Sequence, residues 1–280
     1  MATKPVYLNG RYLPIEDATI SVLDRGFLFG DGVYEVIPAY RGHLFEFEAH
    51  MTRLDNSLAG IRIDNPYSLD EWRDIFSPLL EEGTDGYIYL QITRGVAAKR
   101  DHLFPESAVP TVFAMSSPIL PYPHRDTGIT AVCLQDSRWQ HCHIKAITLL
   151  ANVLLRQEAC EHGGAEAILI KNGFVTEGSS SNVFAVIHGL LLTPPLSHGI
   201  LPGITRAVIL KIAEANAIPY CEQAISIDDL KQADEIWIAS SIREIVPVVE
   251  LDARAIGGGK PGPVWRTVNR LFQAYKHSHS

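Results

Sequence analysis

Two separated segments of the chain carry residue types that can do covalent chemistry together. Lys145 lies in the mainly apolar stretch 144–147, and Glu177 begins the segment 177–182, which has the sequence EGSSSN. A lysine amine becomes a nucleophile when burial or neighbouring cations disfavour its charged form. A carboxylate followed by glycine and three serines can bind a ligand that approaches the backbone closely. Taken singly, a surface lysine and a solvated loop are the ordinary interpretations, so the combination is what indicates a catalytic site.

A glycine-containing segment farther along the chain has the features of a phosphate site. Residues 199–206 have the sequence GILPGITR and lead into an amphipathic helix that we expect from about 205 to 215. Free backbone amides and the positive end of the helix dipole attract phosphate at such a junction. Thr205 can add a hydroxyl donor. Many loop-to-helix junctions look similar, so this segment gains weight only beside other phosphate ligands.

Polar groups of two other elements can complete such a site. Ser240 and Ser241 follow an expected strand over 235–239 and offer two hydroxyl donors. Arg53, on an expected helix from about 48 to 59, supplies the positive charge that a phosphate requires. The alternatives are a simple turn for the serines and an exposed helix position for the arginine.

The elements that must position these residues alternate between strands and helices along the whole chain. Asn9-Gly10 predicts a tight turn inside a hairpin over 6–13, and residues 87–94 alternate apolar and polar side chains as a half-exposed strand does. Residues 68–71 have the pattern of a capping box, which begins a helix to about 82. This mixture predicts an α+β fold.

Three prolines within residues 118–123 interrupt regular pairing and suggest a domain boundary. We therefore expect a small N-terminal domain over 1–117, a linker over 118–125, and a larger C-terminal domain over 126–280 that carries Lys145. A chain of 280 residues is long enough for two such domains.

Composition excludes several classes of function. The formal net charge is -8, whereas nucleic-acid binders need a concentrated basic surface, so small molecules are the expected ligands. The amino-terminal segment lacks the apolar stretch of a secretory signal, and no window approaches the ~20 apolar residues of a membrane helix. The cysteines contain no Cys-x-x-Cys pair, so we expect no metal site, no disulfide framework and a reducing cytoplasm. They are Cys133, Cys142, Cys160 and Cys221.

Five segments, in this order, resemble the class IV aminotransferases. They are 24–35 (DRGFLFGDGVYE), 50–54 (HMTRL), Lys145, 176–182 (TEGSSSN) and 203–206 (GITR). The resemblance spans nearly the whole chain. It implies a fold type IV enzyme that binds pyridoxal 5'-phosphate between two domains, and it implies a homodimer.

The same resemblance implies a role for each motif residue. Lys145 is implied to be the Schiff-base lysine and the catalytic base, Glu177 the partner of the pyridine nitrogen, and Arg53 a phosphate ligand. Glu177 as an anion keeps that nitrogen protonated. The other implied cofactor contacts come from Leu201, Ile204, Thr205, Ser240 and Ser241.

One loop favours a particular branch of this family. Arg100 and His102, two residues apart in an extended segment, can point the same way and bind one carboxylate. An Arg-x-His pair here resembles the carboxylate site of D-amino acid aminotransferases, with Tyr34 as its third member. This branch implies transfer of an amino group from a D-amino acid such as D-alanine to 2-oxoglutarate or pyruvate. Pro38 departs from the pattern, because well-known D-specific enzymes have a basic residue there.

Other branches and one other class of protein remain as alternatives. A branched-chain aminotransferase that uses L-amino acids is the nearest, followed by an aminodeoxychorismate lyase and an R-selective amine transaminase. A folded pseudoenzyme that only binds cofactor or a partner is a different class, and the presence of both Lys145 and Glu177 argues against it.

Overall fold

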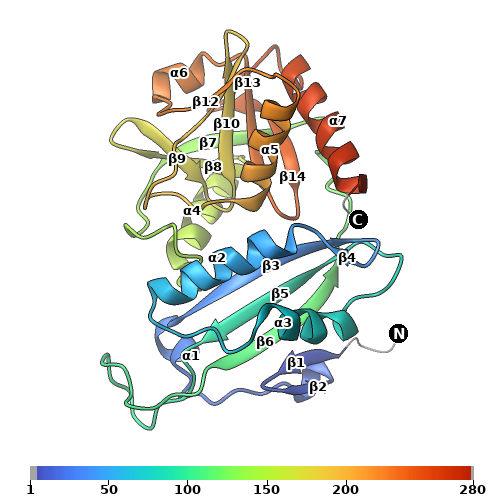
Figure 1. Ribbon diagram of the computed structural model, residues 1–280. Coiled ribbons are helices and arrows are strands. Elements are labelled where there is room, and N and C mark those ends of the chain that lie inside the picture. Colours follow the sequence, from blue (N-terminus) through green and yellow to red (C-terminus); the bar gives the residue numbers. More distant parts are fainter. Residues whose placement is uncertain (1–4, 279–280) are drawn as a thin grey trace. The chain divides into compact units, whose positions relative to one another are not determined.

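The computed structural model describes residues 5–278, which form two compact units (Figure 1). The first unit contains the residues up to Leu120 together with Ile144–Thr148, and the second contains Pro121–His143 and the residues from Leu149 onward. Leu120 lies in the proline-rich segment where the sequence places a linker. The sequence assigned Lys145 to the C-terminal domain, whereas the contacts of its segment are with the first unit.

An antiparallel sheet forms the frame of the first unit, with α2 and α3 across one face (Figure 1). Its strand order is β2-β1-β6-β5-β3-β4, within the described residues. The strands are β1 (Val6–Leu8), β2 (Arg11–Leu13), β3 (Gly32–Tyr40), β4 (His43–Leu44), β5 (Gly86–Thr93) and β6 (Thr111–Pro118). The helices are α1 (Arg25–Phe29), α2 (Phe47–Gly60) and α3 (Leu69–Phe76), with 3-10 turns η1 (Ile15–Asp17) and η2 (Ser77–Leu79).

The local sequence accounts for most of these elements. Asn9 and Gly10 both have positive φ, at 49° and 88°, so the first hairpin turns as predicted. Ile88, on β5, is buried with Leu90 and Ile92 against α2 and α3, which confirms the predicted alternation. The capping box at Ser68 is present. The helix ends at Phe76, earlier than predicted, because the proline that follows Ser77 lacks the amide hydrogen an α-helix needs.

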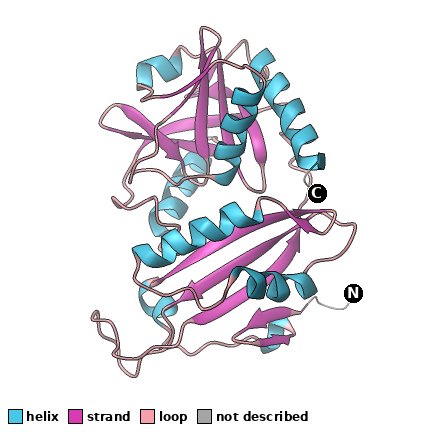
Figure 2. Cartoon of the chain, viewed as in Figure 1, coloured by secondary structure: helices cyan, strands magenta, loops and turns pink. Residues whose placement is uncertain are grey.

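The second unit is built on a larger mixed sheet (Figure 2). Its order in the described part of the chain is β12-β11-β10-β13-β14-β7-β8-β9, and β15 pairs with β14. The strands are β7 (Ile129–Gln135), β8 (Glu166–Lys171), β9 (Phe174–Gly178), β10 (Asn182–Ile187), β11 (Leu190–Thr193), β12 (Tyr220–Glu222), β13 (Glu235–Ser240), β14 (Glu244–Leu251) and β15 (Arg254–Ala255). The helices are α4 (Leu150–Glu161), α5 (Ile204–Ala215), α6 (Ile227–Lys231) and α7 (Pro263–Ser278).

Alternating side chains give β7 and β8 two apolar faces. Val132 and Leu169 pack with Leu155 of α4 on one face, while Ala131 and Ile168 belong to the main core on the other. A strand with both faces covered needs apolar residues at successive positions, and β8 has them. The strand β8, which pairs with β9 and its Glu177, is therefore packed on both faces.

The sequence predicts a helix from about 147 to 159, directly after Lys145, and the helix found there begins later. The amide of Ile147 donates to the carbonyl of Gly32, and Ala146 forms an isolated β-bridge with Val33. These long-range bonds hold residues 146–147 in an extended path, so α4 starts at Leu150 rather than at Ile147. Among residues 5–278, none of the helices combines the length and apolar character that a membrane span requires.

Candidate active site

The first unit brings Lys145 into contact with Tyr34. The Nζ atom of Lys145 lies 4.1 Å from the centre of the Tyr34 ring. Backbone hydrogen bonds fix this pair, because the amide of Tyr34 donates to the carbonyl of Lys145 at 3.0 Å and the amide of Lys145 donates to the Ser57 hydroxyl at 3.1 Å. Lys145 is half-buried. The predicted nucleophile and the predicted substrate tyrosine thus lie side by side although they are distant in sequence.

Arg53 is buried in a charge cluster of the same unit. Its Nε and one terminal nitrogen donate to the two oxygens of Glu35, both at 2.8 Å, and the Nδ1 atom of His50 lies 2.8 Å from the same carboxylate. Burial alone would raise the pKa of Glu35, but Arg53 and His50 hold it well below its usual range. Burial lowers the pKa of His50 and so disfavours the charged imidazole, although Glu35 opposes this shift. Glu35 therefore fixes the orientation of the Arg53 guanidinium.

The loop with Arg100 and His102 is held at its base by Asp24. The Asp24 carboxylate accepts hydrogen bonds from the hydroxyls of Thr93 and Thr111, at 2.8 and 2.6 Å. These threonines face each other where β5 ends and β6 begins. Asp24 also caps α1, since its side chain accepts from the amide of Gly26 at 2.8 Å.

Arg25 holds the outer part of the same loop. Its side chain donates to the carbonyls of Asp101, Leu103 and His102, at 2.6, 3.2 and 3.4 Å. Asp31 orients it through a hydrogen bond from Nε at 2.7 Å. The motif over 24–35 thus acts on the loop by fixing its backbone.

Arg100 and His102 converge on one aromatic ring. The guanidinium of Arg100 lies 4.9 Å from the centre of the Phe29 ring, and the His102 ring lies 5.3 Å from it. Both side chains are exposed, so they are accessible to a carboxylate. The ring contacts of Tyr34 are with Lys145 and Tyr89 instead. Two of the three predicted carboxylate ligands thus share a position at Phe29.

Glu177, in the second unit, is a buried carboxylate whose arginine partner, Arg138, also binds Asp136. Arg138 donates to Glu177 through one terminal nitrogen, while its Nε and the other terminal nitrogen bind Asp136 at 3.0 and 2.8 Å. Burial raises the pKa of Glu177 to about 7, and Arg138 opposes this shift without cancelling it. A positive group next to Glu177 would therefore be bound favourably.

Asn182 links Glu177 to the segment predicted to bind the cofactor ring and phosphate. Its amide nitrogen donates to the carbonyl of Leu201 at 2.9 Å and to Glu177 at 3.3 Å, and the amide of Leu201 donates to Glu177 at 3.0 Å. A β-carbon at Gly203 would lie 1.9 Å from the Asn182 oxygen, so only glycine fits there.

The helix after this segment has an uncapped amino terminus. α5 begins at Ile204, and its N-cap Gly203 has no side chain to bind the first amides. Thr205, in the first turn, is buried, and Ile204 is buried beside it. Arg206 binds the carbonyl of Pro194 at 2.9 Å and Glu222 at 2.5 Å, so it fastens the helix. The backbone amides of this turn suit an anion.

The three serines after Glu177 bind within the protein rather than lining an open loop. The hydroxyls of Ser179 and Ser181 bind the buried carboxylate of Glu166, and Arg243 binds the same carboxylate at 2.5 Å. Arg243 also donates to the hydroxyl of Ser180 at 2.9 Å. Arg243 lies in the turn that contains the half-buried Ser241, after Ser240 at the end of β13. The serine motif therefore anchors the loop to the turn that carries the last predicted phosphate ligands.

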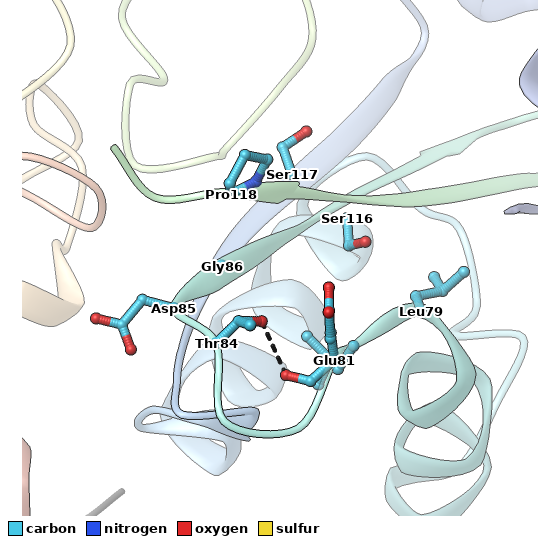
Figure 3. A pocket seen from close by; sticks show the side chains of 9 residues that line it. Leu79, Glu81, Thr84, Asp85, Gly86, Ser116, Ser117 and Pro118 are labelled. Carbon is cyan, nitrogen blue, oxygen red and sulfur yellow. Dashed lines mark hydrogen bonds between the residues drawn. The ribbon is translucent and has the colours of Figure 1, made fainter. Parts of the chain in front are cut away.

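A small pocket at the far end of the first sheet is separate from these residues (Figure 3). It has a volume of about 150 Å³ and lies where β5 begins and β6 ends. Ligand sites usually enclose about 300–1,000 Å³. The hydroxyl of Thr84 donates to the carbonyl of Glu81 at its rim. No predicted site residue lines this pocket, so it is no candidate for the active site.

Comparison with known proteins assigns the family. The family model for amino-transferase class IV matches residues 32–251. The chain belongs to the class IV aminotransferases. This aminotransferase is 41% identical to D-alanine aminotransferase of Staphylococcus aureus (strain N315) over 98% of the chain and 99% of that relative. It is also 41% identical to D-alanine aminotransferase of Bacillus licheniformis, over 96% and 95%.

Solved structures agree with the fold. The Escherichia coli branched-chain amino acid aminotransferase has a TM-score of 0.88 at 29% identity, covering 97% of this chain and 94% of the other. The branched-chain aminotransferase of Thermoproteus uzoniensis has a TM-score of 0.90 at 28% identity, covering 100% and 96%. The expected α+β, fold type IV architecture is thus confirmed.

The cofactor of this class of aminotransferase is pyridoxal 5'-phosphate, and the donor set fits it. The first unit offers the Lys145 amine, and the second offers a buried carboxylate at Glu177 with a raised pKa and an uncapped helix terminus at Ile204. Glu35, Arg25 and Asn182 had no predicted roles. All three lie inside the segments that resemble the family, so their place in these segments was the only sequence feature that could have indicated a role.

Proposed function

We propose that this aminotransferase moves the amino group of a D-amino acid such as D-alanine to a 2-oxo acid such as 2-oxoglutarate or pyruvate. One observation carries the proposal: Arg100 and His102 lie together on Phe29, in a loop that Arg25 holds by three carbonyls. An arginine and a histidine at one place bind a carboxylate by charge and hydrogen bonds. The D-alanine aminotransferases of 41% identity support the same substrate class.

In this proposal the chain's residues hold the cofactor at three points. Lys145 would anchor it through the ε-amine, Glu177 would pair with its ring nitrogen, and Arg53, whose guanidinium Glu35 orients, would bind its phosphate. Leu201 would contact the ring. Ile204, Thr205, Ser240 and Ser241 would supply the remaining phosphate contacts.

Proton transfer is assigned to Lys145 as well. Pyridoxal 5'-phosphate, when bound, supplies the electron sink that the reaction requires. The ε-amine of Lys145, which is free once the substrate amine has taken its place, accepts the proton from the substrate α-carbon, and the contact with the Tyr34 ring directs the amine. Because Arg100 and His102 fix the substrate carboxylate, only one enantiomer presents its α-hydrogen to Lys145.

Substituting Lys145 by alanine tests the assignment of the nucleophile. We expect Lys145→Ala to abolish transamination while far-ultraviolet circular dichroism stays unchanged, since a half-buried lysine contributes little to the core. Exposed Lys260 provides the matched control, and Lys260→Ala should keep full activity. Turnover of D-alanine by Lys145→Ala would refute the role.

Substituting Arg100 by alanine tests the substrate class. We expect kcat/KM for D-alanine to fall by roughly 10- to 150-fold, the effect of losing about 1.5–3 kcal/mol from a charged hydrogen bond. Lys99 is exposed on the same loop and pairs with Asp101 at 3.4 Å, so Lys99→Ala is the control and should change little. Rates are measured with 2-oxoglutarate for D-alanine and for L-leucine. Turnover of L-leucine alone would identify a branched-chain enzyme instead.

The proposal includes a cytoplasmic homodimer. The resemblance to the class IV aminotransferases implies a homodimer, and in this dimer the exposed Arg100 and His102 act on the active site of the second copy. Light scattering should give twice the chain's mass of 30.9 kDa. Mixing Arg100→Ala with Lys145→Ala chains should then restore activity, whereas failure of both experiments would contradict the dimer.

A further inference from the structure

Three histidines of the second unit form a cluster that the aminotransferase reaction does not use. They are His141, His143 and His198, and one ring nitrogen of each lies within 4.8 Å of those of the others. The rings of His143 and His198 are stacked with centres 4.3 Å apart. His141 lies 5.8 Å from His143 and 6.1 Å from His198. Three imidazoles from two separate segments thus have ring nitrogens close to one another.

The backbone holds the two segments together. The amide of His143 donates to the carbonyl of His198 at 3.3 Å. This bond joins the turn at residues 141–144 to the loop between β11 and α5. The hydroxyl of Ser197 accepts from the amide of Gly199 at 3.1 Å and fixes the local turn. His141 and His198 are exposed, so their rings can rotate without disturbing the core.

One ring nitrogen of the cluster lies where a metal ion could bind it. The Nδ1 atom of His143 is buried and has no hydrogen-bond partner. An unpaired buried nitrogen is costly unless something occupies it.

We propose that His141, His143 and His198 bind one divalent transition metal ion, of which Zn²⁺ is the best match. Zinc takes three imidazoles in a tetrahedral site, with bonds of about 2.0–2.1 Å and a water in the fourth position. That geometry places the nitrogens roughly 3.4 Å apart, so a small rotation of the exposed rings closes the site. The cysteine spacing led us to expect no metal site, and only the fold brings these histidines together.

The position of the cluster gives the ion a consequence for the cofactor site. The carbonyl of Gly199, next to His198, accepts a hydrogen bond from Arg138 at 3.3 Å. The amide of Leu201 binds Glu177 at 3.0 Å. An ion that ties His198 to His143 therefore stabilises the segment on which Arg138 and Glu177 depend. Metal binding should raise thermal stability more than it changes the chemistry.

Zinc titration of the holoenzyme tests the proposal. The untagged protein is stripped with a chelator, dialysed against Zn²⁺ and assayed for metal per chain by mass spectrometry, with Kd measured by competition against a chromophoric chelator. We compare His141→Ala and His198→Ala, both at exposed positions, with His124→Ala. His124 is an exposed histidine of the same unit outside the cluster.

The expected result is one tight Zn²⁺ per chain, a Kd weakened at least tenfold in both cluster variants, and a Kd within twofold of the parent in His124→Ala. Zn²⁺ should also raise the melting temperature of the parent and of His124→Ala but not of His198→Ala. No stoichiometric binding would overturn the proposal. Equal binding by the parent and the cluster variants would overturn it too, because the ion would then be held by thiols, by the cofactor or by other histidines.

Discussion

Glu35 and Glu177 are both buried carboxylates beside an arginine, yet their charges are balanced differently. Arg53 gives Glu35 two hydrogen bonds and His50 supplies a third, all at 2.8 Å. Arg138 divides its donors between Glu177 and Asp136. Burial raises both pKa values; around Glu35 the neighbouring groups reverse the shift, whereas around Glu177 burial prevails and the pKa rises to about 7.

The comparison separates a structural ion pair from a carboxylate that can accept another partner. The first cluster is complete within the protein, so Glu35 remains an anion that orients Arg53. In the second cluster one arginine serves two carboxylates, and Glu177 gains from an added positive group such as a protonated ring nitrogen. Of these two carboxylates, Glu35 should therefore contribute more to stability and Glu177 more to catalysis.

The largest expected effect on stability follows from Glu35→Gln. Removing this anion leaves Arg53 buried without its charge partner, which should cost about 3–5 kcal/mol in free energy of unfolding. Glu48 pairs with Arg73 on the surface of the same unit, so Glu48→Gln is the control and should cost less than about 1 kcal/mol. Urea unfolding followed by circular dichroism measures both. Equal losses in the two variants would remove the distinction.

Glu177→Gln should reduce kcat with little loss of stability. Losing a charge that stabilises the reacting state costs on the order of 100- to 1,000-fold. Arg138 keeps its pair with Asp136, so the free energy of unfolding should change much less than in Glu35→Gln. Glu177→Asp, which restores the charge, should recover part of the rate. A variant that unfolds as readily as Glu35→Gln would place Glu177 with the structural pairs.

The smallest effects should appear in the pH dependence of stability of the cofactor-free protein, where Glu35 and Glu177 should give slopes of opposite sign. The pKa of Glu35 is lowered on folding. Its contribution to the free energy of unfolding is therefore present above the ordinary carboxyl pKa of about 4.3 and is lost as pH falls below that value. The pKa of Glu177 is raised to about 7. Its contribution to the free energy of unfolding is therefore present below about pH 4.3 and is lost as pH rises to 7.

Melting temperatures between pH 3 and 8 measure these slopes. Glu35→Gln should remove part of the acid-side loss, and Glu177→Gln should remove part of the decline toward neutral pH. Saturating pyridoxal 5'-phosphate should flatten the second slope in the parent protein, because a ring cation lowers the pKa of Glu177. Unchanged slopes in either variant would show that other groups control that range.

Much of the fold could be predicted because it depends on short-range patterns. The Asn9-Gly10 turn, the alternation along β5 and the capping box at Ser68 each rest on neighbouring residues. Arg100 and His102 both contact Phe29 because residues two positions apart in an extended segment point to the same side. Predicted element bounds were wrong where a residue distant in sequence formed the hydrogen bond instead of a local partner. The bond from Ile147 to Gly32, for example, moves the start of α4 to Leu150.

The sequence by itself determined which groups are available: an amine, a set of carboxylates, glycines at tight contacts and an Arg-x-His pair. Only the tertiary structure decided which groups share a partner. The contact of Lys145 with Tyr34, the division of Arg138 between two carboxylates, and the meeting of three histidines all join residues from separate elements. Periodicity records which side of an element is buried, but it does not record what lies opposite that side, and the balance of buried charge depends on that neighbour.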